Sequence, residues 1–302
     1  MTWVEVARQT GGQTSGGESI LSATVRRRRL GRKLRSLRDA QRLTLEDVAA
    51  KAGWLTTAKL SRLETARSAA KPADVEKLLD LYGVDDAELR GALLSLAREG
   101  AQRGWWHSYR GVLSPVYEDL ISLEHEATSV RTWQMGVIPG LLQTGDYARE
   151  IISTTAMTEG VDVDPLVEVR LARQVVLTRE HPVSLWAIIA EGALRTRSSG
   201  DGVMREQLSR LLDRARRPNV TIQILPTDAP PHVGQMGSYS LLSFDDGADL
   251  DVVHVESLTS ALYVEEAEQV AVYREAFERL RAAALPPDLS VQRIAEIRDR
   301  RE

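Results

Sequence analysis

The segment LTLEDVAAKAGWLTTAKLSRLE, residues 43–64, constrains the fold more than any other part of this chain. Thr44 is a good N-cap residue, and Asp47 follows three positions later, close to a capping-box arrangement. The pattern predicts a short helix that ends at Gly53, because a helix stop needs a residue that tolerates a positive φ.

A second short helix is expected directly after this turn. It begins at Thr56 or Thr57, and the spacing of Leu60 and Leu63 places both side chains on the inward face. Two short helices joined by a tight turn form the pattern of a helix-turn-helix. A second helix presented in this way can enter the major groove of DNA.

The distribution of charge along the chain supports this interpretation. The 302 residues carry a formal net charge of −4, but residues 1–71 have a net charge of +9 and the remainder has −13. A basic N-terminal unit joined to an acidic body is typical of a nucleic-acid-binding domain attached to another domain. Because the acidic body would repel phosphates, DNA contacts are expected only in the N-terminal part.

Composition and motifs exclude several other classes of protein. The chain has no Cys, so it has no disulfides, Cys-based zinc sites or thiol chemistry. It contains no apolar run of membrane-spanning length and no signal-peptide core, which favours a cytoplasmic protein without membrane association. It also lacks phosphate-loop, GxSxG, Rossmann and HExxH motifs. We therefore predict no metal, no cofactor and no enzymatic activity.

The chain divides into four predicted parts. Residues 1–19, rich in Gly, Ser, Thr and Gln, are expected to form a mobile tail. The pattern of residues 20–100 predicts five short helices, and residues 101–285 are expected to form a second domain. Residues 286–302 are expected to form a C-terminal extension in which Ser290 caps a short helix. The fold class is thus multidomain, with an all-α N-terminal domain followed by an α+β domain.

Helical and strand patterns in the second domain support this fold class. The predicted helices cover residues 117–133, 141–158, 164–179, 203–216 and 266–284. The predicted strands cover residues 183–190, 220–225, 238–244, 250–255 and 261–264. Several consecutive strands with flanking helices indicate a mostly antiparallel sheet. The apolar stripe of the last helix fits either a partner or dimer face or packing on this sheet.

Two sets of motifs carry a family resemblance. LGRKLRSLRDAQRLTLEDVAAKAG and KLSRLETAR resemble the lambda-repressor-like, or Xre-type, DNA-binding domain. The body resembles the WhiJ-like, antitoxin-like regulators of actinomycetes. Together with the N-terminal resemblance at residues 30–83, this covers about residues 25–285. Its motifs are RGWWHSYRGVL, VIPGLLQTGDYAR, VEVRLARQVVLTRE, LWAIIAEGALR, MREQLSRLL, RPNVTIQILP and VVHVESLTSALYVEEAEQVAVYREAFERLRAAAL.

The resemblance implies a transcription regulator that binds double-stranded DNA, and three roles for its body remain open. In the first, the protein is a homodimer on a two-fold operator. In the second, an antitoxin-like interaction module mainly autoregulates its own operon together with a small acidic partner protein. In the third, the body senses a small-molecule effector.

The sequence departs from the family pattern at three places. Leu45 occupies the position of a Gln that commonly contacts the DNA backbone, and the segment between Gly53 and Glu64 is one residue longer than usual. Ala66 stands where the family has a glycine after the second helix. The second helix is therefore expected to extend further.

Candidate DNA contacts fall on the second helix and on a basic run. The side of the helix that faces the groove comprises Thr57, Ala58, Lys59, Ser61 and Arg62, of which Arg62 suits a guanine edge. The alternative is a solvated polar face. The phosphate-contacting candidates are Arg26, Arg27, Arg28, Arg29, Lys33, Thr44, Thr56 and Arg67. The alternative for the basic run is a solubilising surface.

Two further groups of residues have expected roles of a different kind. In the family fold a Glu at position 64 pairs with an Arg of the first helix, so we predict a structural ion pair between Glu64 and Arg35 or Arg38. Trp105, Trp106 and His107 are candidates for a ligand or dimer contact, but paired Trp residues more often fill a core.

Overall fold

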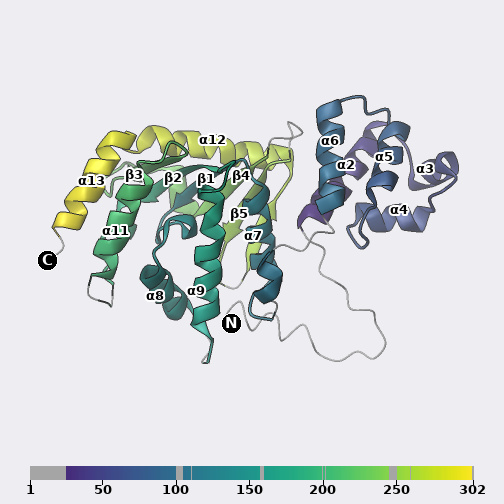
Figure 1. The fold of residues 1–302 in the computed structure, drawn as a ribbon. Coiled ribbons are helices and arrows are strands. Elements are labelled where there is room, and N and C mark those ends of the chain that lie inside the picture. Colours follow the sequence, from purple (N-terminus) through teal and green to yellow (C-terminus); the bar gives the residue numbers. More distant parts are fainter. Residues whose placement is uncertain are drawn as a thin grey trace. The chain divides into compact units, whose positions relative to one another are not determined.

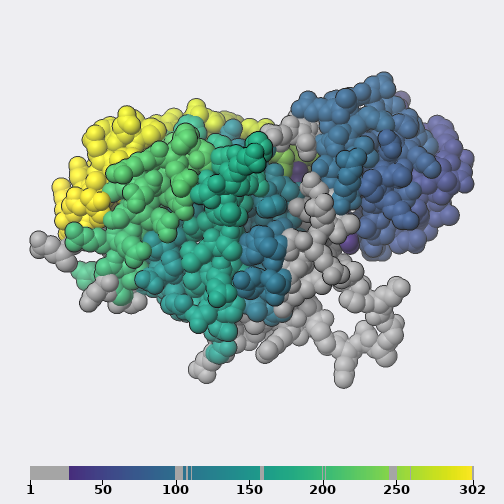
Figure 2. All heavy atoms as spheres, in the orientation of Figure 1, coloured from purple at the N-terminus to yellow at the C-terminus, as the bar shows by residue number. Residues whose placement is uncertain are grey.

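The computed structural model resolves two compact units, which are described separately (Figures 1 and 2). The helical unit is described over residues 25–99 and 105–107. The α+β unit is described over residues 108–109, 111–156, 160–198, 200, 202–244, 251–258 and 260–300, and residue 250 clusters with the helical unit. The tail expected at residues 1–19 lies outside the described residues.

The described residues of the helical unit contain five α-helices, as predicted. They are α2 (Val25–Ala40), α3 (Leu45–Ala52), α4 (Thr57–Glu64), α5 (Pro72–Leu81) and α6 (Ala87–Glu99). Their apolar stripes meet in one core, in which Leu34, Val48, Leu60, Leu78, Leu79 and Leu93 are fully buried. Burial of these side chains is the main force that holds such short helices together, because helices of this length are marginal in isolation.

The ends of α3 follow the sequence prediction closely. The Thr44 hydroxyl accepts a hydrogen bond from the backbone N–H of Asp47, and the Asp47 carboxylate accepts one from the backbone N–H of Thr44. These two bonds complete the capping box. The bond from the Thr44 N–H and a further one from the Thr44 hydroxyl to the same carboxylate lower the pKa of Asp47. Gly53 ends the helix with φ +68°, in the left-handed region. The predicted turn between α3 and α4 is therefore confirmed.

The expected extension of α4 is wrong. The helix ends at Glu64, and Ala66 takes φ +58° although it is not a glycine. The backbone thus keeps the left-handed conformation that a glycine would adopt without strain. Ala66 is also buried, so its methyl group packs inside the unit. The missing glycine changes the strain at this position and not the path of the chain.

The crossing of α2 and α4 depends on Gly31, which lies in the interior of α2. A methyl group at this position would be 2.6 Å from the carbonyl oxygens of both Leu63 and Glu64. These are backbone atoms, so the clash can be relieved only if the two helices separate. Gly91 in α6 is also inside a helix, but a methyl group there would have no neighbour within 4 Å.

We predict opposite effects for alanine at these two glycines. Gly31→Ala should lower the free energy of unfolding of the helical unit by about 2–3 kcal/mol through overpacking. Gly91→Ala should raise it by about 0.5–1 kcal/mol, because alanine favours a helix interior. Thermal or urea unfolding of the two variants tests both signs. Equal changes in the two variants would show that Gly31 does not set the approach of the helices.

The second unit contains a six-stranded mixed sheet with strand order β3-β2-β1-β4-β5-β6. The strands are β1 (Ser129–Gln134), β2 (Ser184–Ala190), β3 (Val220–Leu225), β4 (Tyr239–Ser243), β5 (Val252–Glu256) and β6 (Ala261–Val264). β1 pairs with β2, and β2 with β3, in parallel, whereas the other three pairs are antiparallel. The predicted α+β class with a mostly antiparallel sheet is confirmed.

The central strand β1 was not predicted. The sequence pattern predicts one helix over residues 117–133, but helix α7 (Pro115–Glu126) ends at Glu126 and β1 follows after two residues. β1 carries Val130, Thr132 and Trp133, which are β-branched or aromatic and therefore favour a strand. Side chains on both faces of β1 are buried. The strand therefore lacks the clear alternation of polar and apolar residues that marks a strand with one face exposed to solvent.

The remaining elements surround this sheet. They are η1 (Trp105–Tyr109), η2 (Gly140–Leu142), α8 (Gly145–Thr155), α9 (Val163–Ala172), η3 (Arg173–Leu177), α10 (Glu191–Arg195), α11 (Val203–Arg214), η4 (Val233–Met236), α12 (Ala267–Ala283) and α13 (Pro287–Asp299). Ser290 was expected to cap a C-terminal helix, but it does not cap α13. It lies buried inside that helix, where its hydroxyl accepts a hydrogen bond from the N–H of Ile224 in β3.

One face of the sheet is covered by α12, which contacts β1, β3, β4 and β5 (Figure 1). Val270, Phe277 and Leu280 of this helix are buried in a core with Trp133 and Leu241 of the sheet. Of the two interpretations of the apolar stripe at 266–284, the structure therefore favours packing on the sheet. Side chains on the opposite face of β1, β4 and β5 are turned toward α7 and α9.

Candidate nucleic-acid interface

Helix α4 presents one apolar and one polar side. Leu60 and Leu63 are buried in the core of the helical unit. Ala58 and Arg62 are exposed, and the other three groove candidates, Thr57, Lys59 and Ser61, are half-buried. The helix therefore has the amphipathic form of a recognition helix, with its polar side available to a partner.

Arg62 and Arg67 are two exposed cations at and just after the end of α4. Both are exposed, and within the described part of the chain neither side chain forms a hydrogen bond or ion pair. A guanidinium that has no hydrogen-bond or ion-pair partner within the protein can bind a base edge or a phosphate without first breaking an internal bond.

Lys59 differs from Arg62 because its ammonium group is engaged inside the unit. Its Nζ lies 2.8 Å from Oδ2 of Asp74 in α5 and 5.7 Å from the ring centroid of Trp54. The ammonium of Lys77 lies 5.2 Å from the same ring. Sequence reasoning could not find this arrangement, because Asp74 is 15 residues from Lys59 and no helical spacing relates them. Lys59 thus joins α4 to α5.

The two candidate threonines both serve as helix caps. The hydroxyl of Thr56 accepts a hydrogen bond from the backbone N–H of Lys59 and retains its own proton for a further acceptor. The hydroxyl of Thr44 accepts from the backbone N–H of Asp47 and also donates to its carboxylate, at 2.7 Å. Thr56 therefore retains a donor for a phosphate, whereas the donor of Thr44 is occupied.

The basic run lies at the start of α2, and its members differ in exposure. Arg27, Arg28 and Lys33 are half-buried, whereas Arg29 is only 4% exposed. The side chain of Arg26 lies outside the described residues. The guanidinium of Arg29 therefore faces the interior of the unit, and Arg27, Arg28 and Lys33 are the more accessible members of the run.

Glu64 forms a bidentate ion pair with one of its two candidate partners. Nε and Nη2 of Arg38 donate to Oε1 and Oε2 of Glu64 at 2.7 and 3.0 Å, and both side chains are buried. This pairing raises the pKa of the Arg38 guanidinium. The guanidinium of Arg35 instead lies 3.7 Å from the exposed carboxylate of Asp39. The pair fastens α2 to the last residue of α4.

The tryptophan pair lies in η1. Trp106 is buried, Trp105 is half-buried, and their rings meet edge to face with centroids 5.9 Å apart. The side chain of the third candidate, His107, lies outside the described residues. This geometry is that of an ordinary aromatic core contact.

Comparison with known proteins agrees with the two-unit organisation. Residues 29–92 match a family model described as a helix-turn-helix domain, and residues 117–296 match one described as a domain of unknown function (DUF5753). No curated protein shows significant similarity to the chain. Among the described residues, no helix has the length and apolar character needed to cross a membrane. The helix-turn-helix match supports a DNA-binding regulator, and the match over more than half of its length shows that the chain belongs to the DUF5753 family.

Proposed function

We propose that the protein is a sequence-specific transcription regulator of the lambda-repressor-like type, in which α4 enters the major groove. The observation that carries this proposal is the polar side of α4, where Arg62 is exposed and without an internal partner, while Leu60 and Leu63 hold the opposite side in the core. The five-helix arrangement and the net charge of the N-terminal part support the same conclusion.

We further propose that the regulator acts as a homodimer. A single α4 of 8 residues reaches only a few base pairs, and a two-fold arrangement doubles the length of sequence that is read. The α+β unit would form the dimer contact, because the small helical unit buries its apolar side chains in its own core and uses the polar side of α4 to bind DNA. Half-sites separated by about one helical turn of DNA, roughly 34–36 Å, are expected in the operator.

A selection experiment tests the proposal directly. Fragmented genomic DNA is incubated with the purified protein, and the bound fragments are sequenced and then assayed at two salt concentrations. Enrichment of one palindromic site would support a sequence-specific dimer. Weak binding to all fragments, lost at the higher salt concentration, would show that the protein does not recognise sequence.

Two variants separate base contacts from phosphate contacts. Arg62→Ala should weaken binding to the selected site by about 1–3 kcal/mol and relax the preference at one base position. The double variant Arg27→Ala, Arg28→Ala should weaken binding to all sequences equally and reduce the dependence of affinity on salt. Binding isotherms on the selected site and on a scrambled site distinguish the two effects. An unchanged salt slope in the double variant would place both arginines away from DNA.

A further inference from the structure

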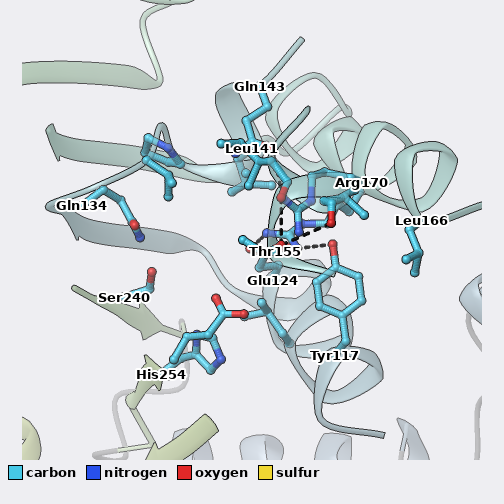
Figure 3. Close-up of a pocket in the computed structure, with 18 of the residues that line it drawn as sticks. Tyr117, Glu124, Gln134, Leu141, Gln143, Thr155, Leu166, Arg170, Ser240 and His254 are labelled. Carbon is cyan, nitrogen blue, oxygen red and sulfur yellow. Dashed lines mark hydrogen bonds and ion pairs between the residues drawn. The ribbon is translucent and has the colours of Figure 1, made fainter. Parts of the chain in front are cut away.

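The α+β unit contains a cavity of about 340 Å³ between its sheet and helices α7, α8 and α9. Gln134, Ser240 and His254 come from the sheet, and Tyr117, Glu124 and Arg170 come from α7 and α9 (Figure 3). The cavity lies wholly within this unit and shares no residue with the candidate nucleic-acid interface. Its size is within the range of sites that hold small organic molecules.

Most of the cavity wall is apolar. The wall includes Leu120, Val130, Ile138, Ile152, Leu166 and Leu185. These side chains come from α7, β1, the segment before η2, α8, α9 and β2, so the wall is formed by elements that the fold holds together independently. A surface of this kind accepts the hydrocarbon body of a ligand and provides no hydrogen bonds along it.

Charged groups are concentrated on one side of the cavity. Nη2 of Arg173 donates to Oε1 of Glu124, and Nη1 of Arg173 donates to the hydroxyl of Tyr117, each at 2.8 Å. Glu124 and Arg173 are 5% and 6% exposed, which makes this a buried ion pair. Arg170 lies beside the pair and donates from Nη1 to Oε1 of Gln143 at 3.1 Å.

The charges of this cluster do not cancel. Glu124 neutralises Arg173, but Arg170 forms no ion pair with any carboxylate among the residues that the structure describes. Glu256, the other carboxylate of the lining, is exposed to solvent. Its charge acts on Arg173 and Glu124, but solvent screens it more strongly than it screens the charges of the buried pair. Burial raises the pKa of the Tyr117 phenol, yet the neighbouring Arg173 and Arg170 outweigh burial and lower it. The inner part of the cavity is thus electropositive.

Several polar atoms of the cluster also lack partners. Nε of Arg170, Nε of Arg173 and Oε2 of Glu124 are buried without a hydrogen bond among the described residues. Unpartnered buried donors and acceptors are costly, so native proteins seldom keep them unless water or a ligand satisfies them. Two of the three are donors on guanidinium groups, which prefer an anionic oxygen acceptor.

We propose that this cavity binds a small monocarboxylate, with the carboxylate on Arg170 and an apolar body against the hydrophobic wall. Arg170 supplies the charge that has no internal counterpart, while the Arg173–Glu124 pair holds Tyr117 in place below it. A cationic molecule is disfavoured by the net positive charge of the cluster. A neutral molecule of the same shape would fill the wall but leave Arg170 uncompensated.

Three probes with one skeleton test the assignment: 3-phenylpropanoate, 3-phenylpropanamide and 3-phenylpropylamine. They are titrated calorimetrically into the full-length protein at neutral pH and millimolar probe concentration, without DNA. We expect the carboxylate to bind at least about tenfold more tightly than the amide, and the amine not to bind. Because the assay contains no DNA, its failure would leave the DNA-binding proposal unaffected.

Two matched variants locate the carboxylate. Arg170→Met keeps the length of the side chain without its charge, so it should reduce carboxylate affinity at least about tenfold and leave amide affinity unchanged. Arg149→Met makes the same substitution at an exposed arginine of α8 outside the cavity lining, and it should leave both affinities unchanged. The assignment is overturned if no probe binds, if amide and carboxylate bind equally, or if the two variants behave alike.

Discussion

Glu64→Gln is expected to lower the free energy of unfolding of the helical unit by about 3 kcal/mol. The substitution keeps the shape of the side chain but leaves the guanidinium of Arg38, 9% exposed, without the carboxylate that neutralises it. Removal of one partner from a buried pair typically costs about 3–5 kcal/mol. We expect the lower end of this range, because Asp39, 54% exposed, also lies 2.7 Å from Nη1 of Arg38.

Hydrogen exchange of peptides from α2 and α4 would measure this effect without interference from the α+β unit. Glu46→Gln provides the matched control, since Glu46 is exposed and should change stability by less than about 0.5 kcal/mol. The double variant Arg38→Met, Glu64→Leu should recover much of the loss because no buried charge remains. It should not recover all of it, because Arg38 also donates to the carbonyl of Leu43 at 2.6 Å. A Glu64→Gln protein as stable as the parent would contradict the structural role of the pair.

The helical unit was predictable because its signals are local. The cap at Thr44, the stop at Gly53 and the stripe formed by Leu60 and Leu63 each act within one or two turns of helix, and the structure keeps all of them. Ala66 was the exception. Propensity predicts a longer helix there, but the tertiary path requires a left-handed residue, and the chain accepts the strain of a non-glycine.

The α+β unit shows what local signals cannot determine. The pattern of residues 117–133 predicts a helix and hides β1, because both faces of this strand are covered and it lacks the alternation by which a strand is recognised. Since β1 lies at the centre of the sheet, its absence from the prediction also hid the cavity beside it. The pairing of Glu124 in α7 with Arg173, 49 residues later, has no sequence spacing that could indicate it.

The second large effect concerns pH. His254 in β5 is 7% exposed, and burial, assisted by the positive charge of Arg173, lowers its pKa from the usual 6.5 to about 4. The folded protein therefore holds this imidazole neutral, whereas the unfolded chain binds a proton as the pH falls below about 6.5. The contribution of the neutral imidazole to the free energy of unfolding is therefore fully present above pH 6.5 and is lost as the pH falls toward 4. A shift of this size corresponds to about 3 kcal/mol.

The expected result is a fall of about 3 kcal/mol in the stability of the α+β unit between pH 7 and pH 4, of which His254→Gln should remove most. Other groups contribute to the pH dependence, including Glu191: burial would raise its pKa, but its Arg195 and Arg293 partners outweigh burial and lower it. Hydrogen exchange in strands β1 and β4 measures the stability of parent and variant at each pH. The difference between the two proteins gives the contribution of His254 alone. His181→Gln, at an exposed histidine, should preserve the full fall. If His254→Gln keeps the parent's pH dependence, the imidazole is accessible to protons in the folded protein, and the inner wall of the cavity is wetter than its burial indicates.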